Sequence, residues 1–180
     1  MNTNDLRVKK TQKAIKKTFH ELLEAKPVSK ITVTELAKAA EINKATFYLH
    51  YNDIFDLYQK SLCEYLEGVA NQITFMDLFF TDIDMFAEKL YELSTEHKLF
   101  KKSVFFSPEN TPYNQGAVQT FCSILSDKVL ALGFIENNKI NQMKLHYIFA
   151  GIGMLFRFDY SPRKEDVISI IVGAYKGQFS

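Results

Sequence analysis

The sequence predicts an all-α protein, and three observations support this fold class. Apolar residues recur every three or four positions through almost every segment, which is the periodicity of amphipathic helices. No stretch alternates apolar and polar residues for long enough to indicate a β-strand, and no internal repeat is visible. The prolines stand where helical patterns stop or start: Pro27, Pro108, Pro112 and Pro162.

Length and composition indicate a globular chain that we expect in the cytoplasm. With 180 residues, 47% of them hydrophobic and 24% charged, the chain can bury a large core. No apolar run approaches the roughly 20 residues needed to cross a bilayer. The basic N-terminus is not followed by the apolar stretch of a secretory signal. Cys63 and Cys122 stand alone and are expected as reduced thiols. We expect no cofactor and no metal site, because the histidines are scattered.

The first two expected helices are marked by apolar spacing and by end signals. Over Val8–Ala25, apolar residues at helical spacing oppose a lysine-rich face, and Pro27 ends the pattern. Thr32 and Glu35 form the S/T-x-x-E pattern of a capping box, which predicts a short helix running to Ala40.

The later helices follow from the same signals. Residues 41–43 are too few for anything but a tight turn, and Asn43 is a suitable N-cap for a third helix from Lys44 to about His50. Asn52 or Asp53 can cap a fourth helix, which runs towards residue 70. Further helices are expected near residues 84–97, 99–106, 113–132, 140–158 and 163–175, with a break at 108–112.

Two short helices joined by three or four residues have the geometry of a helix-turn-helix unit. Small and apolar side chains would form its interior: Leu36, Ala37, Ala40, Ile42 and Phe47. The start of its second helix would carry polar, cationic and hydroxyl groups outward: Asn43, Lys44, Thr46, Tyr48 and His50. Such groups reach phosphate oxygens and base edges in a major groove. The alternative for Tyr48 and His50 is a place at the edge of the core.

The window Ile31–Tyr51, ITVTELAKAAEINKATFYLHY, resembles the DNA-binding signature of the TetR family of transcriptional regulators. It is most similar to a Gram-positive branch with an INxxTFYLHY recognition helix, and the similarity extends over about Lys10–Leu57. The resemblance implies a three-helix helix-turn-helix DNA-binding domain over residues 1–52, followed by a helical dimerisation and effector-binding domain over residues 53–180. It also implies DNA contacts from these residues: Thr32 to the backbone, Asn43, Lys44, Thr46, Tyr48 and His50 to phosphates or bases, and Ala45 close to the bases.

Three positions depart from the family pattern. Glu41 stands where glycine is common in the turn, which disfavours a left-handed backbone at that residue. Ile54 replaces a lysine that often opens the fourth helix and binds phosphate. Leu49, where a second tyrosine is common, offers only apolar contact, for example to a thymine methyl group.

Charge is unevenly distributed along the chain. Residues 1–60 carry eleven Lys and Arg against seven Asp and Glu, whereas residues 61–180 carry eleven against fourteen. A basic N-terminal part suits a polyanionic partner, although a solvated lysine face gives the same count. The arm Arg7–Lys10 either reaches DNA or is a solvated helix end.

Two apolar stripes near the C-terminus predict a homodimer. The first contains Ile140, Met143, Tyr147, Gly151, Met154 and Phe158, and the second contains Val167, Ile170, Ile171 and Ala174. Paired across a two-fold axis they would form a four-helix interface, in which Gly151 permits close approach and Gly153 faces the protomer's own core. The alternative is that both stripes face the core of one protomer.

The leading hypothesis is a dimeric, sequence-specific DNA-binding transcriptional regulator. It would act as a repressor on a pseudo-palindromic operator in double-stranded DNA and be released by a small apolar effector, with no membrane partner. Most aromatic residues of the central region are expected in the core, and some are candidates for lining an effector cavity. The alternative is a helical DNA-binding regulator controlled by a protein partner. An enzyme is not expected, because the sequence has no nucleophile–base grouping, Gly-rich phosphate loop or HExxH site.

Overall fold

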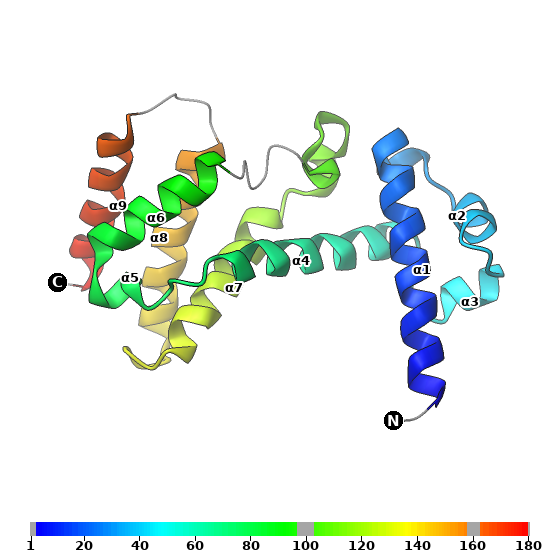
Figure 1. Ribbon diagram of the computed structural model, residues 1–180, viewed down its shortest axis with the longest axis horizontal. Helices are drawn as coiled ribbons and strands as arrows, with labels where there is room; N and C mark the ends of the chain where they lie inside the picture. Colours follow the sequence, from blue (N-terminus) through cyan, green and yellow to red (C-terminus); the bar gives the residue numbers. More distant parts are fainter. Residues whose placement is uncertain (1–2, 97–102, 158–162, 180) are drawn as a thin grey trace. The chain divides into compact units, whose positions relative to one another are not determined.

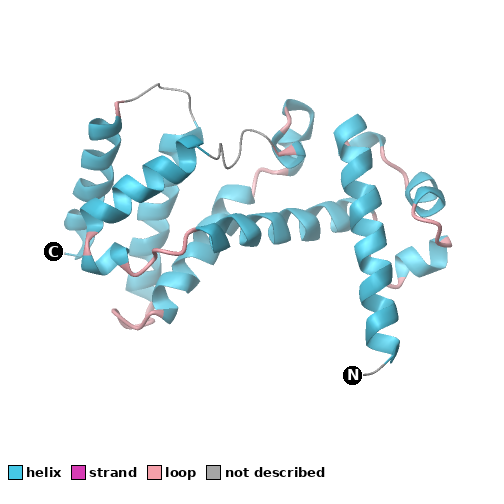
Figure 2. Cartoon of the chain, in the orientation of Figure 1, coloured by secondary structure: helices cyan, strands magenta, loops and turns pink. Residues whose placement is uncertain are grey.

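The computed structural model describes residues 3–96, 103–157 and 163–179 (Figure 1). In this part of the chain every regular element is helical and there is no strand, which confirms the all-α prediction (Figure 2). In chain order the elements are α1 (Thr3–Ala25), η1 (Val28–Lys30), α2 (Val33–Ala39), α3 (Lys44–Tyr48), α4 (Ile54–Gln72), α5 (Leu78–Thr81), α6 (Ile83–Glu96), η2 (Val104–Phe106), η3 (Pro108–Tyr113), α7 (Ala117–Ala131), α8 (Lys139–Arg157) and α9 (Lys164–Phe179).

Most predicted helices are present with shifted ends, but the described part of the helix expected at residues 99–106 is only the 3-10 turn η2. The break expected at residues 108–112 is the 3-10 turn η3, because Pro108 is pre-organised for a first helical turn. The helix expected from residue 113 begins only at Ala117. The short helix α5 was not predicted. Residues 99–102 of another expected helix lie outside the described residues, as does Pro162, which precedes the last expected helix.

The chain divides into two compact units. The first unit comprises Met1–Glu64 together with Ser103–Gln115, and the second comprises Tyr65–Lys102 with Gly116–Ser180. The first unit is therefore made of two separate stretches of sequence. The functional division expected at residue 52 stays a prediction, but the compact unit extends beyond it.

The core of the first unit is formed where α1, α2, α3 and the start of α4 meet. Ile15 and Phe19 of α1 are fully buried, as are Leu36 of α2, Phe47 of α3 and Leu57 of α4. Figure 1 shows α2 and α3 on the same side of α1. Ile15, Phe19 and Leu23 give one buried apolar residue per turn over the second half of α1, which explains why a helix with so many lysines packs stably.

Ser103–Gln115, here called the return segment, completes the first unit. Asn110 is fully buried; its Oδ1 accepts a hydrogen bond from the Val28 amide at 3.0 Å, and its Nδ2 donates to the Val104 carbonyl at 3.0 Å. The hydroxyl of buried Tyr58 on α4 donates to the Phe105 carbonyl at 2.9 Å. These bonds satisfy polar groups that are costly to bury unpaired.

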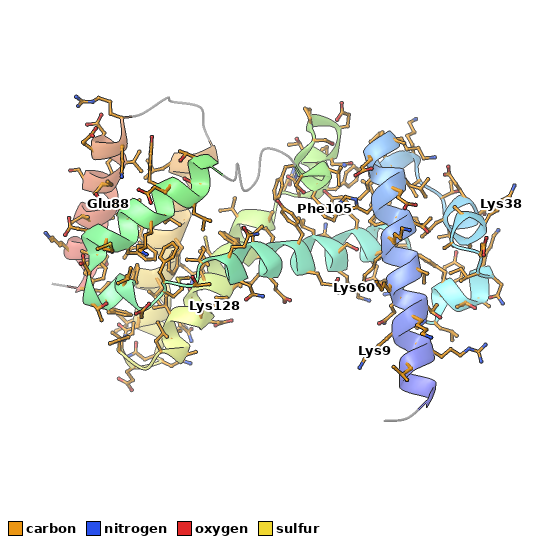
Figure 3. All side chains as sticks on the ribbon, viewed as in Figure 1. Lys9, Lys38, Lys60, Glu88, Phe105 and Lys128 are labelled. Carbon is orange, nitrogen blue, oxygen red and sulfur yellow. The ribbon has the colours of Figure 1, made fainter. Side chains whose placement is uncertain are left out.

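Aromatic packing adds to this attachment. The Tyr58 and Phe105 ring centroids are 5.4 Å apart, edge to face, and the Phe55 and Tyr113 rings are stacked at 5.2 Å. Asn114 Nδ2 donates to the Phe105 carbonyl at 2.7 Å, which therefore accepts two hydrogen bonds. Figure 3 shows Phe105 extending from the return segment.

The second unit is a helical bundle with an aromatic core. Helix α7 packs along α8, and α6 packs along α9. Phe79 of α5 is fully buried, with its ring centroid 5.4 Å from Phe86, 5.4 Å from Phe149 and 5.1 Å from Tyr175. These rings form ordinary core, as expected for most of the aromatic residues.

The apolar stripe of α8 faces outward, whereas that of α9 does not. Ile140, Met143 and Tyr147 are 67%, 67% and 66% exposed. Val167 and Ile171 are buried in the second unit's own core, so their assignment to an outward stripe was wrong. Ile170 is exposed and Ala174 half-buried; Phe158 lies outside the described residues.

The two glycines of α8 have different surroundings. A Cβ atom on Gly151 would meet no atom within 4 Å, whereas one on Gly153 would lie 3.9 Å from Val118 Cγ1 of α7. Gly153 therefore faces the interior of its own unit, as predicted. Gly151 lies on the exposed side, in line with Tyr147 and Met154.

Candidate nucleic-acid interface

The turn between α2 and α3 is closed by a left-handed residue. Glu41 has φ of 55°, the one positive φ at a non-glycine position among the described residues. The Glu41 amide donates to the Lys38 carbonyl at 3.3 Å and the Ile42 amide to the Ala37 carbonyl at 2.9 Å. This is the Schellman pattern of a helix C-terminus.

The expectation against a left-handed backbone at Glu41 was therefore wrong. The two hydrogen bonds and the packing of half-buried Ile42 impose the conformation despite a strain of about 1 kcal/mol for a residue with a Cβ. The turn sets how α3 leaves α2. Together α2, this turn and α3 form a helix-turn-helix unit, with Leu36, Ala37 and Phe47 buried as predicted, while Ala40 and Ile42 are half-buried.

Thr32 caps the first helix of this unit. Its Oγ1 accepts a hydrogen bond from the Glu35 amide at 3.2 Å. The reciprocal bond of a capping box is not made, because the Glu35 carboxylate binds Lys26 Nζ instead, at 2.8 and 2.6 Å. Lys26 follows the end of α1, so this ion pair ties α1 to α2. Thr32 itself remains exposed.

Asn43 caps α3 and orders the first turn of that helix. Its Oδ1 accepts hydrogen bonds from the Thr46 amide at 2.7 Å and from the Thr46 hydroxyl at 3.0 Å. The hydroxyl hydrogen of Thr46 is thereby used within the protein, and its oxygen can still accept. The Asn43 Nδ2 group makes no hydrogen bond among the described residues.

The side chains of α3 divide into a buried face and an exposed face. Phe47 is buried, and so is Tyr51, which lies beyond the end of α3. Burial raises the pKa of Tyr51 to about 12. The exposed face carries most of the predicted contact residues. Asn43, Lys44 and Ala45 are exposed, Tyr48 is 56% exposed, and Thr46 and His50 are half-buried.

The start of α4 offers no cation. Ile54 is buried, and the helix is capped by Asp53, whose Oδ1 accepts a hydrogen bond from the Asp56 amide at 2.7 Å. Asp56 in turn accepts from the Asn52 amide at 2.9 Å and pairs with Lys60. The Asn52 bond, then Lys60, lowers the pKa of Asp56. The first residue of α4 is therefore a buried apolar side chain and cannot bind a phosphate as a lysine would.

A lysine-rich face lies along α1. Lys9, Lys13, Lys16 and Lys17 surround an open hollow with Gln12. Lys16 pairs with Glu64 of α4, and Lys17 lies 3.8 Å from Glu21. Figure 3 shows Lys9 near the start of α1. Part of this positive charge is compensated by carboxylates of the same unit.

Most predicted contact residues thus gather on α3 and its N-cap, while His50 lies two residues beyond the end of α3 and Thr32 lies apart at the start of α2. One feature escaped sequence reasoning, and a second was noted in the sequence only as a departure from the family pattern. The return segment holds α1 and α4 together, but its partners are tens of residues away. Leu49 is 80% exposed, the highest value among large apolar side chains in the described ranges.

No protein-family model matches this sequence, and no curated protein matches it. Among solved structures, the chain is similar to the fatty acid degradation regulator FadR from Bacillus halodurans, with 15% identity, a TM-score of 0.39 and coverage of 92% of this chain and 93% of that one. It is also similar to the HlyIIR mutant protein with residues 170–185 substituted by alanine, with 20% identity, a TM-score of 0.29 and coverage of 97% of both chains.

Two kinds of feature are absent from the described residues. No helix there is long and apolar enough to cross a membrane. No group of three or more His, Cys, Asp or Glu side chains in those ranges is arranged to hold a metal ion.

Proposed function

We propose that this chain is a sequence-specific, DNA-binding transcriptional regulator of the TetR type. One observation carries the proposal: α3 follows α2 through a tight turn, buries Phe47, and presents Asn43, Lys44, Ala45 and Tyr48 to solvent. A short helix held in this way enters a major groove with its first residues against phosphates and base edges.

The roles of the side chains follow from which groups remain available. Lys44 is exposed and has no ion pair among the described residues, so it meets a phosphate. Asn43 donates through Nδ2, because its oxygen is used in capping. Thr46 acts chiefly by ordering Asn43, since its hydroxyl hydrogen already has an acceptor. Tyr48 on α3 and His50 just beyond its end extend the contact, and Ala45 leaves room for the bases. Thr32 meets the DNA backbone.

The regulator acts as a homodimer in this proposal. The exposed side of α8 carries four large apolar side chains, Ile140, Met143, Tyr147 and Met154, in one line with Gly151, which suits contact with the same helix of a second copy. A two-fold dimer presents two copies of α3 and so binds a pseudo-palindromic operator. Repression, with release by a small apolar effector in the second unit, completes the proposal.

Fluorescence anisotropy of the full chain on duplex DNA tests this function. The log of the affinity should fall with the log of the salt concentration, with a slope of several units, because each phosphate contact releases counterions. A slope near zero, or no binding at low salt, would contradict DNA binding. For the effector, native mass spectrometry should detect a bound small molecule. A protein partner recovered in its place would contradict that part alone.

A further inference from the structure

The Leu49 side chain is exposed to solvent, and the fold does not need an apolar side chain at this position. Its side chain is 80% exposed, while its backbone is regular: it is the C-cap of α3, and its amide bonds to the Ala45 and Phe47 carbonyls. The exposure is thus a property of an ordered position. A polar residue would serve folding at this place equally well.

Leu49 is part of a narrow apolar strip between polar groups. Ala45, also exposed, lies one helical turn before it on the same side of α3. Lys44 and Asn43 lie at the start of the same helix, and His50 follows directly. An apolar strip this small is insufficient for a protein partner, since stable protein interfaces bury about 800 Å² on each side.

The major groove of DNA presents a matching surface. There, the 5-methyl group of thymine is an isolated apolar group among hydrogen-bonding edges and phosphates, and cytosine lacks it. A strip of Ala and Leu bordered by a cation and amides is complementary to such a groove in both charge and polarity.

We propose that Leu49, with Ala45 beside it, contacts a thymine 5-methyl group and thereby selects an A·T pair at one position of each half-site. This inference rests on the proposed function, since it needs α3 in the major groove. It adds a base preference that the polar residues of α3 do not supply. Leu49 is then a specificity-determining residue and contributes little to binding on unrelated DNA.

Deoxyuridine isolates the methyl group, because it pairs like thymidine and lacks only that group. Duplexes are first enriched from a randomised library with the full-length protein, and each thymidine of the winning site is then replaced by deoxyuridine. At one position in each half-site, replacement should weaken binding about fourfold, or about 0.8 kcal/mol for one methyl-sized group. Leu49→Ala should weaken binding to the thymidine site and abolish the difference between thymidine and deoxyuridine.

Leu132→Ala is the matched control. Leu132 is also an exposed leucine at a helix C-cap, with φ −73° and ψ −18° against −69° and −19° for Leu49, but it belongs to the second unit. It should leave the thymidine preference unchanged. Circular dichroism melts should show that both variants fold, since the Leu49 side chain is 80% exposed and the Leu132 side chain 42% exposed.

The outcomes separate this inference from the proposed function. Salt-dependent binding of an enriched site whose thymidine preference survives Leu49→Ala would overturn the role of Leu49 and leave the regulator intact. Equal binding of every deoxyuridine duplex by the parent would do the same. Failure to enrich or bind any duplex would overturn both.

Discussion

The Asn110 side chain accepts a hydrogen bond from the backbone amide of Val28, 82 residues earlier, at 3.0 Å. Both residues are fully buried, and Val28 belongs to the turn η1 that directly follows α1 and leads into α2. As the first amide of the 3-10 turn, the Val28 N–H has no acceptor within that turn and needs one from elsewhere. Asn110, from the middle of the chain, therefore supplies the hydrogen-bond acceptor that the N-terminal helices lack.

Asn110→Ala should destabilise the protein by about 1–3 kcal/mol, because it leaves the Val28 amide and the Val104 carbonyl buried without partners. Urea unfolding followed by circular dichroism measures the loss. Asn71→Ala, at an exposed position of α4, is the control and should change the free energy of unfolding little. Equal unfolding midpoints for the two variants would contradict the role given to Asn110.

Glu41→Gly should stabilise the protein by up to about 1 kcal/mol, because glycine adopts the left-handed conformation without strain. The gain is reduced by the larger entropy of glycine in the unfolded chain. Glu41→Ala removes the same carboxylate but keeps a Cβ, so it should show no such gain in urea unfolding. A glycine variant no more stable than the alanine variant would show that φ at this residue carries no strain.

Asp56→Asn should lower the free energy of unfolding at neutral pH. The Asn52 amide and then Lys60 hold the pKa of Asp56 below its usual value of 3.8 in the folded protein. This carboxylate therefore stabilises the fold above its unfolded-state pKa, and its contribution is lost as pH falls through the folded pKa. Unfolding curves of parent and variant should converge in strong acid. A difference that stays constant from pH 7 to pH 2 would point to a cause other than ionisation.

Gly151→Leu should weaken subunit association, because a large side chain would separate the two α8 helices of the proposed dimer. The Gly151→Leu protomer should fold normally, since a Cβ atom on residue 151 meets no atom of its own protomer within 4 Å. Gly153→Leu should instead lower thermal stability, because Val118 lies 3.9 Å from its Cβ position. Sedimentation and circular dichroism of both variants decide the matter. Unchanged association of Gly151→Leu would place the interface elsewhere.

Lys44→Ala should weaken DNA binding without affecting the fold, since the side chain is exposed. If Lys44 meets a phosphate, affinity should fall alike on the enriched site and on random DNA, and the salt slope should drop by about one unit. Lys89→Ala, an exposed lysine of α6 in the second unit, is the charge-matched control. Parental affinity of Lys44→Ala on both DNAs would remove Lys44 from the interface.

Local signals in the sequence predicted local structure well. The Asn43 cap, the tight turn and the burial of Leu36 and Phe47 depend on residues within a few positions of one another, and all are present. Apolar spacing also indicated that Val167 is on a packed face. It did not indicate which helix covers that face, so an interface between copies was predicted where the core of one protomer lies.

Two long-range contacts and one local turn explain the remaining differences. The bond between Asn110 and Val28, and that between Tyr58 and the Phe105 carbonyl, join positions whose separation no short pattern encodes. At Glu41 the packing of Ile42 and two hydrogen bonds override the preference of the residue itself. The contacts of α3 with DNA remain predictions until binding is measured.

The division of the first unit between two stretches of sequence limits how it can be exchanged between proteins. A fragment ending at Glu64 would expose the side of Tyr58 that Phe105 covers and leave the Val28 amide without an acceptor. Grafting such a fragment onto another body would therefore transfer α3 without part of its support. For this chain, the smallest transplantable unit includes the return segment, so recombination that separates residues 1–64 from 103–115 is expected to be disfavoured.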